Sequence, residues 1–229
     1  MTRLIEAAWE GEPPPTVAEQ VANGMSALRR EMGRHEPSPR IERGPAGYTL
    51  DLAGHELDLD LFRRWVARAH ALADRADLAG AVAALTDAVG LWRGAALAGL
   101  DTLALRAAAE RFDELKLAAL EDLGWLELRR GNPDPVTRFV AELVARHPVR
   151  ERLVALLMFA LLRAGRRAEA LIAYGRLRAS LVAQLGIEPQ PELADLHRSI
   201  LRGRRLDATD VTLGRSSWVT SLEHSVRAG

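Results

Sequence analysis

The residues best suited to catalysis do not fall into any arrangement that catalysis requires. The six histidines stand at positions 35, 55, 70, 147, 197 and 224, and none belongs to the His-Glu-x-x-His pair that holds a catalytic zinc ion. The sequence has no Gly-x-Ser-x-Gly elbow for a serine nucleophile, no phosphate-binding loop of the Gly-Lys-Ser/Thr type and no cysteine. We therefore predict a protein that is not an enzyme, with no catalytic residues, no cofactor and no metal site.

A run of acidic side chains could in principle form a carboxylate site. Its members are Glu110, Asp113, Glu114, Glu121 and Asp122. Arg111 and Lys116 lie among them, and such mixed charge along a helix is typical of a solvated face. We interpret the run as surface rather than as a site.

Charge and composition restrict the class of protein further. The 31 basic residues are balanced by 31 acidic ones, so no overall positive field draws the chain to nucleic acid, and any DNA contact has to be local. The longest charge-free helical run, Leu153–Leu162, has 10 residues, about half of the roughly 20 that span a bilayer. No secretion signal opens the sequence. We predict a cytoplasmic protein that does not enter a membrane.

The first fifty residues are organised as helix, turn, helix and hairpin. A short apolar helix over Leu4–Trp9 meets Gly11 and three prolines, after which Thr16 is placed to cap a second helix that extends to Met32 or Gly33. Apolar residues of this second helix form one stripe, which we expect to be buried. They are Val17, Val21, Met25, Leu28 and Met32. Arg40–Arg43 and Tyr48–Leu52 then flank a glycine-rich turn, which predicts a β-hairpin.

From Asp58 onward the sequence pattern is helical almost without interruption. Gly131 and Gly165 are 34 residues apart, and Gly165, Glu169, Ala170 and Tyr174 match the turn and second helix of a tetratricopeptide unit. The predicted helices cover about 58–75, 78–92, 103–130, 134–147, 150–164, 167–185 and 190–202.

The apolar residues of these helices predict how the helices pack. Leu153–Leu162 is apolar around most of its circumference and should be the most buried helix. Leu171, Tyr174, Leu177 and Leu181 form a single stripe, which a stacked neighbour would cover. Trp92 could anchor a ligand, but an aromatic residue at a helix end is more often a packing wedge, and we favour packing.

Several local motifs resemble one known family. Leu91-Trp92-Arg93-Gly94, with Ala95 to Leu100 after it, is followed by His147-Pro148-Val149-Arg150-Glu151 and by Gly186-Ile187-Glu188-Pro189. In spacing and residue type this series resembles the bacterial transcriptional activator domain of antibiotic regulators from actinomycetes, over about Leu59–Leu201. The resemblance implies a helical repeat domain that serves a transcription factor, by supporting dimerisation or the recruitment of RNA polymerase.

The first fifty residues resemble the second half of a winged helix-turn-helix domain of response-regulator type. In that family the helix after the turn enters the major groove, and a wing arginine lies on the DNA backbone. By position, the resemblance implies that Ser26, Arg29 and Arg30 face bases or phosphates and that Arg43 is the wing residue. Guanidinium groups suit both tasks, since they can bind guanine or hold two phosphate oxygens.

Three departures from that family reduce the expected affinity for DNA. The small sheet and first helix that precede the position of Leu4 in the family are not in this sequence, so we expect only half of the domain. Ala18, Gly24 and Ala27 stand where relatives often carry basic or strongly hydrogen-bonding residues. Residues 1–50 contain six arginines and seven glutamates, a balance that is poor for the release of counterions from DNA.

Together these features predict a mainly α protein, with a tetratricopeptide-like helical repeat domain after a partial winged helix-turn-helix. The expected parts are a DNA-binding segment at 1–52, a linker at 53–57, the helical domain at 58–202 and a tail without a packed element at 203–229. The predicted function is DNA-binding regulation of a specialised-metabolite gene cluster, by a homodimer that binds promoter DNA weakly and contacts RNA polymerase or another protein through its helical domain. The alternative is a protein- or ligand-binding module that has lost independent DNA binding.

Overall fold

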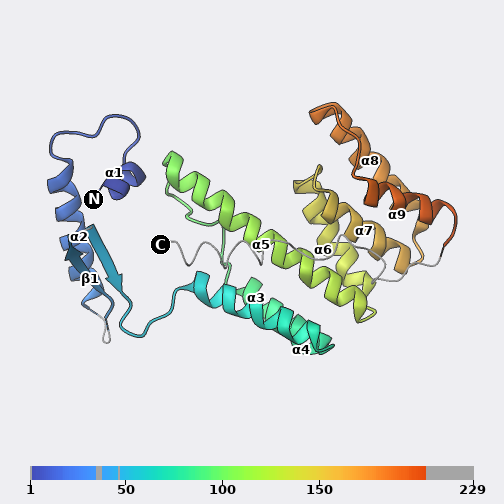
Figure 1. Cartoon of the computed structure of the whole chain (residues 1–229), viewed down its shortest axis with the longest axis horizontal. Helices are drawn as coiled ribbons and strands as arrows, with labels where there is room; N and C mark the ends of the chain where they lie inside the picture. The colour runs from blue at the N-terminus through green and yellow to red at the C-terminus, as the bar shows by residue number, and fades with distance from the viewer. Residues whose placement is uncertain (1, 35–37, 46, 205–229) are drawn as a thin grey trace. The chain divides into compact units, whose positions relative to one another are not determined.

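The computed structural model describes residues 2–34, 38–45 and 47–204 (Figure 1). Its elements are α1 (Thr2–Ala8), α2 (Val17–Met32), β1 (Arg40–Gly44), β2 (Gly47–Asp51), α3 (Asp58–Asp74), α4 (Leu78–Gly90), α5 (Leu103–Arg129), α6 (Pro133–Arg146), α7 (Glu151–Arg163), α8 (Arg167–Leu185) and α9 (Pro191–Leu201). The predicted mainly α fold is confirmed, and the helices from α3 on match their expected ranges within two residues at either end. The expected tail lies, from residue 205, outside the described residues.

Contacts divide the described residues into two compact units. One unit combines the described part of Met1–Arg64 with Gly90–Lys116, and the other combines Trp65–Val89 with the described residues from Leu117 on. The division into a segment at 1–52 and a helical domain at 58–202 stays a prediction. Within the described residues, none of the helices combines the length and the apolar character needed to cross a membrane.

In the first unit, α2 is followed by the predicted hairpin. β1 pairs with β2 in antiparallel register, with Ile41 opposite Leu50 and Arg43 opposite Tyr48. Thr16 precedes α2 as expected but makes no capping hydrogen bond through its side chain. Its hydroxyl accepts a 3.1 Å hydrogen bond from the side-chain amide of Gln20.

The apolar stripe of α2 is only partly buried. Val21 is buried, whereas Leu28 is 49% exposed, so the expectation that the whole stripe is buried is wrong for Leu28.

The N-terminus of α5 is capped by residues that stand more than 90 positions earlier. Thr102 precedes α5, and its hydroxyl donates a 2.7 Å hydrogen bond to the Ala7 carbonyl oxygen. A Glu10 carboxylate oxygen accepts a 2.7 Å hydrogen bond from the Leu103 amide and lies 3.2 Å from the Arg106 guanidinium. A carboxylate at a helix N-terminus satisfies amides without an intrahelical partner and interacts favourably with the helix dipole. These contacts fasten the chain around α1 to the first turn of α5.

One type of turn follows four of the helices, and two of its occurrences are the glycines that define the 34-residue repeat. Gly131 and Gly165 have φ of 87° and 76°, and each donates a hydrogen bond three residues back while the next residue donates five residues back. This pair of bonds is the Schellman motif. The same two bonds occur at Ala76 and Gly203, so the turn recurs after α3, α5, α7 and α9. The sequence revealed only the pair at Gly131 and Gly165, because residue 76 is alanine and Gly203 follows Gly165 by 38 residues rather than 34.

We expect Ala76→Gly to stabilise the protein. Ala76 has φ of 62°, a left-handed conformation that costs an L side chain about 1–2 kcal/mol. Glycine loses more backbone entropy on folding than alanine does, and this loss offsets part of the relieved strain. The unfolding free energy should therefore rise by about 0.5–1 kcal/mol. Urea denaturation checks the value. Gly165→Ala, in the equivalent turn, is the matched control and should shift the midpoint in the opposite direction. Equal effects of the two changes would contradict the assignment of a shared turn.

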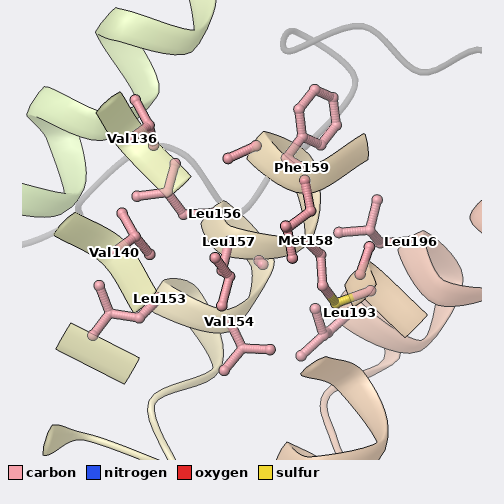
Figure 2. Close-up of a cluster of buried hydrophobic side chains, with 14 of the residues drawn as sticks. Val136, Val140, Leu153, Val154, Leu156, Leu157, Met158, Phe159, Leu193 and Leu196 are labelled. Atoms are coloured by element: carbon pink, nitrogen blue, oxygen red, sulfur yellow. The ribbon is translucent and has the colours of Figure 1, made fainter. Parts of the chain in front are cut away.

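The core of the second unit surrounds α7. Residues 153–161 of this helix are all buried, as its apolar circumference predicts. Figure 2 shows Leu156 on the side of Val136 and Val140 of α6, and Met158 on the side of Leu193 of α9.

A glycine allows α5 to approach α7 closely. A Cβ atom added to Gly124 would lie 2.5 Å from Cδ2 of Leu156, a fully buried side chain with little room to move.

The stripe predicted on α8 also faces this core, with Leu177 and Leu181 buried and Leu171 and Tyr174 packed against the cluster.

A polar network lies in the second unit between α5 and the residues around the start of α7. Glu121 is fully buried, and its Oε1 accepts a 2.5 Å hydrogen bond from Nε of Arg150 while its Oε2 lies 3.1 Å from Nε of Arg152. Asp122 is also buried, and its Oδ2 lies 2.9 Å from Nε2 of His70 on α3. The interpretation of the acidic run as a solvated face is therefore wrong for Glu121 and Asp122. Their partners stand far away in sequence and allow the carboxylates to be buried.

Removal of the Glu121 carboxylate should destabilise the fold. Glu121→Leu leaves two guanidinium groups without their buried partner, and such a change costs about 3 kcal/mol when the stranded cations retain some access to water. Arg150 and Arg152 retain that access, with side chains 23% and 26% exposed. Glu121→Gln keeps a hydrogen-bond acceptor and should cost less. Chemical denaturation of the wild type, Glu121→Leu and Glu121→Gln at neutral pH gives the order of their unfolding free energies. A Glu121→Leu variant that is more stable than the wild type would refute the role assigned to the network.

The same variants should differ in their pH dependence. Burial raises the pKa of the Glu121 carboxyl above its ordinary value, against the opposing effects of Arg150 and Arg152. The folded state then binds this proton more tightly than the unfolded state, so the contribution of Glu121 to stability decreases as pH rises through the raised pKa. The unfolding free energy of the wild type minus that of Glu121→Gln should thus be larger at pH 5 than at pH 7.5. A difference that falls as the pH is lowered would contradict the direction of the pKa shift.

Candidate nucleic-acid interface

Arg29 attaches the C-terminal half of α2 to the hairpin. Its Nε donates a 2.7 Å hydrogen bond to the carbonyl oxygen of Ile41 in β1. Its guanidinium carbon also lies 5.8 Å from the centre of the Tyr48 ring in β2, within the range of a cation–π interaction. Arg29 is therefore in contact with both strands and fixes where the helix meets the hairpin.

Arg43 is the cross-strand partner of the same tyrosine. It is directly opposite Tyr48 in the strand register, and the alternation of side chains along a strand puts it on the same face as Ile41. Its side chain is exposed. The structure thus brings two of the residues proposed from the sequence, Arg29 and Arg43, to one tyrosine.

Ser26 and Arg30 complete the set proposed from the sequence. The hydroxyl of Ser26 donates a 2.9 Å hydrogen bond to the Ala22 carbonyl oxygen of its own helix, which leaves its oxygen lone pairs as acceptors. Arg30 is exposed, and within the described residues neither its side chain nor that of Arg43 forms a hydrogen bond or an ion pair.

Two further arginines, Arg34 and Arg40, stand between Arg30 and Arg43 in the sequence. We call the side of the chain that carries these arginines the arginine surface. Arg34 forms an exposed ion pair with Glu31 at 2.9 Å, which neutralises both groups locally. Arg40, at the start of β1, is exposed. The positive charge that the arginine surface offers to a ligand is therefore carried mainly by Arg30, Arg40 and Arg43.

These arginines suit an anionic, extended ligand. A guanidinium group can donate two parallel hydrogen bonds to a phosphate or to a guanine edge. Arg30 and Arg43 are available for such bonds, whereas Arg29 already uses its Nε on the hairpin. The contribution of Tyr48 to this arrangement was not anticipated from the sequence, although an aromatic residue directly opposite an arginine in a predicted hairpin was an available signal.

The helical part of the chain shows which family the chain belongs to. Residues 57–201 match the family described as "Bacterial transcriptional activator domain". The chain belongs to this family. The resemblance noted from the motifs around Trp92, His147 and Gly186 is thereby confirmed. The bacterial transcriptional activator domain is found in transcriptional regulators, so the expectation that the protein is not an enzyme also holds.

Relatives from Streptomyces extend the similarity into the first fifty residues. The chain is 34% identical over 199 residues to Regulatory protein AfsR of Streptomyces griseus, which covers 87% of this chain and 20% of AfsR. It is 32% identical over 209 residues to Regulatory protein DnrI of Streptomyces peucetius, which covers 87% of this chain and 76% of DnrI. The chain thus spans about a fifth of AfsR and three quarters of DnrI.

A solved structure shares the fold. It is the Mycobacterium tuberculosis protein EmbR in complex with a low-affinity phosphopeptide, with a TM-score of 0.85 and 30% sequence identity. The similarity covers 98% of this chain and 58% of the EmbR chain. The fold of this chain is therefore similar to that of EmbR.

We expect Arg29→Met to loosen the hairpin. The substitution removes the hydrogen bond to Ile41 and the contact with Tyr48, and at this exposed site the local opening free energy should fall by about 0.5–1 kcal/mol. Amide hydrogen exchange of β1 and β2 should then become about two- to fivefold faster. The matched control is Arg30→Met, because the neighbouring residue makes no such contact. Unchanged exchange in Arg29→Met would contradict the assignment of Arg29 as the attachment point.

Proposed function

We propose that this chain is a DNA-binding transcriptional regulator that contacts promoter DNA through α2 and the β1–β2 hairpin. One observation carries this proposal. Arg30 on α2 and Arg43 on β1 are exposed and form no hydrogen bond or ion pair within the described residues, and Arg29 holds α2 against the hairpin. Membership of a family of transcriptional regulators supports the same conclusion. In this proposal Arg30 and Arg43 bind phosphate or base edges, Ser26 accepts a hydrogen bond from an amino group of a base, and Arg29 mainly positions the hairpin.

We assign protein contacts to the helical domain. Several large apolar side chains are about half exposed on α8 and directly after it. They are Ile172, Val182, Leu185 and Ile187. Apolar side chains exposed in this way favour contact with RNA polymerase, another protein or a second copy of the chain. A homodimer would place two weak DNA-binding surfaces on paired half-sites and so increase the affinity.

The proposed target is a promoter within a specialised-metabolite gene cluster, read in the cytoplasm where the chromosome lies. The similarity to regulators of Streptomyces supports this choice. Sequencing of the genomic fragments retained by the purified protein would test it. Enrichment of promoters from such a cluster is expected, and enrichment confined to other genes would refute the choice of target while leaving DNA binding intact.

A second candidate function is a protein- or ligand-binding module without independent DNA binding. The observations that favour it are the incomplete burial of the α2 stripe, with Leu28 half exposed, and the excess of one glutamate over arginine in residues 1–50. Such a segment binds DNA weakly by charge alone. The two functions differ in whether the chain prefers its own promoter at low salt.

The DNA-binding proposal predicts the effect of Arg30→Ala combined with Arg43→Ala. Fluorescence anisotropy with the chain's own upstream promoter fragment, against scrambled DNA, should show a decrease in binding free energy of about 1–3 kcal/mol for each arginine that donates two hydrogen bonds to a base. For each arginine that binds a phosphate instead, the slope of log K against log salt should become shallower by about 0.9.

Arg138→Ala combined with Arg176→Ala is the matched control. It removes the same charge from exposed positions on α6 and α8 and should leave the salt slope unchanged. Equal affinities of the wild type and the Arg30/Arg43 variant would overturn the assignment of these residues. Failure of the wild type to prefer its promoter even at low salt would favour the second candidate function.

A further inference from the structure

The turns that follow α7 and α9 meet at one edge of the second unit. α8 and α9 pack against each other (Figure 1), and the Arg167 guanidinium at the start of α8 donates a 2.6 Å hydrogen bond to the Leu201 carbonyl oxygen at the end of α9. A Cβ atom added to Gly203 would lie 3.9 Å from another nitrogen of the same guanidinium. Arg167 therefore lies against the turn that carries Arg202 and Arg204, and these residues all belong to the same compact unit.

Two other arginines at this edge are neutralised by acidic side chains. The Arg166 guanidinium donates two 2.7 Å hydrogen bonds to the Glu169 carboxylate, and Asp134 on α6 acts on the same guanidinium through its charge. Arg198 forms an ion pair with Asp195 one turn earlier on α9. These pairs leave little net charge for a partner.

The charges of Arg167, Arg202 and Arg204 are not compensated in this way. We call these three residues the second-unit cluster. All three are exposed. Arg167 bonds to a carbonyl oxygen and not to a carboxylate, and within the described residues the side chains of Arg202 and Arg204 form no hydrogen bond or ion pair.

Arginines at a solvated helix end are common, but that explanation accounts for only part of this charge. A cation near a helix C-terminus is favourable because the helix dipole places about half a negative elementary charge there. α7 and α9 end at this edge and α8 begins there, so the three dipoles sum to about −0.5 elementary charge. Arg167, which bonds the carbonyl of the last residue of α9, more than balances that value. The charges on Arg202 and Arg204 remain for an anionic partner.

The surroundings of the cluster favour phosphate groups over an acidic protein. Within residues 163–167 and 201–204, Leu201 is the one large apolar side chain that is exposed, whereas protein interfaces usually depend on several apolar or aromatic anchors. Phosphate binding needs only positive charge and N–H donors, and a guanidinium group can pair with two phosphate oxygens. Residues 1–50 carry more glutamates than arginines, so DNA binding by this chain needs positive charge from elsewhere.

We propose that the second-unit cluster binds the phosphate backbone of duplex DNA without reading its sequence. This inference rests on the proposed function, because it takes the chain to act on DNA. The two surfaces then have different tasks. The arginine surface of the first unit selects the sequence, and the second-unit cluster adds affinity that is the same for every sequence.

The test is a salt titration of the full chain with promoter DNA and with scrambled DNA as separate fluorescent probes. Arg202→Gln combined with Arg204→Gln removes two charges and keeps the hydrogen bond of Arg167. If each arginine binds one phosphate, the slope of log K against log salt should become shallower by about 1.8 with both DNAs. The ratio of wild-type to variant affinity then grows about 3.5-fold for each halving of the salt concentration. The preference for the promoter should stay unchanged.

Two controls separate charge at this place from other effects. Arg202→Lys combined with Arg204→Lys keeps both charges and should retain most of the salt slope, since lysine also binds phosphate. Arg138→Ala combined with Arg176→Ala removes the same charge elsewhere in the second unit and should leave the slope unchanged. Urea denaturation should give the same midpoint for the wild type and the Arg202/Arg204 variants, because both side chains are exposed and unpaired.

The outcomes distinguish this proposal from promoter recognition by the first unit. A wild type that binds both DNAs equally, with a shallower slope in the Gln variant, would contradict promoter recognition and support the cluster. Equal slopes of the wild type and the Gln variant with scrambled DNA, or no binding of either DNA at low salt, would overturn the cluster. Binding of a labelled oligoglutamate peptide that requires Arg202 and Arg204, while DNA binding does not, would overturn it in favour of an acidic protein segment.

Discussion

The burial of α7 is the constraint on which the second unit depends. Residues 153–161 form more than two turns of helix without a polar side chain, and a helix that is apolar on all sides cannot be covered by one neighbour. It therefore needs α6, α8, α9 and the second half of α5 around it at the same time. This requirement explains why the stretch has helices in close succession and short turns between them, since each neighbour has to return to the same central helix.

The polar network complements that apolar core. Contacts between leucine and valine side chains tolerate some sliding, whereas the Glu121 carboxylate has to meet Arg150 and Arg152 at hydrogen-bonding or ion-pairing distance. Because Glu121 stands on α5 and the arginines stand at the start of α7, we ascribe to these contacts the axial register of the two helices. In that register Gly124, on the same helix as Glu121, lies directly against Leu156 of α7.

Periodicity and glycine positions were sufficient to predict the helices from α3 to α9 and the hairpin, because those signals are local. Features that depend on distant partners were not predictable in the same way. The burial of Glu121 depends on an arginine 29 residues away, and a turn at Ala76 lacks the glycine that normally marks its conformation. In the candidate site, Arg29, Arg30 and Arg43 could be named from position, but only the contacts with Ile41 and Tyr48 show that Arg29 is held against the hairpin, whereas Arg30 and Arg43 form no such contact.

The capping of α5 by Glu10 and Thr102 has a consequence for the modular view of such regulators. The family match begins at residue 57, yet the first turn of α5 receives a hydrogen-bond acceptor from residue 10, and Thr102 is bonded to the carbonyl oxygen of residue 7. A fragment cut at the start of the family match would keep α5 and Thr102 but lose the Glu10 carboxylate that accepts a hydrogen bond from the Leu103 amide. The start of the family match and the point at which the chain can be divided without exposing a helix end are therefore different, and an expression fragment of this protein should retain its first ten residues.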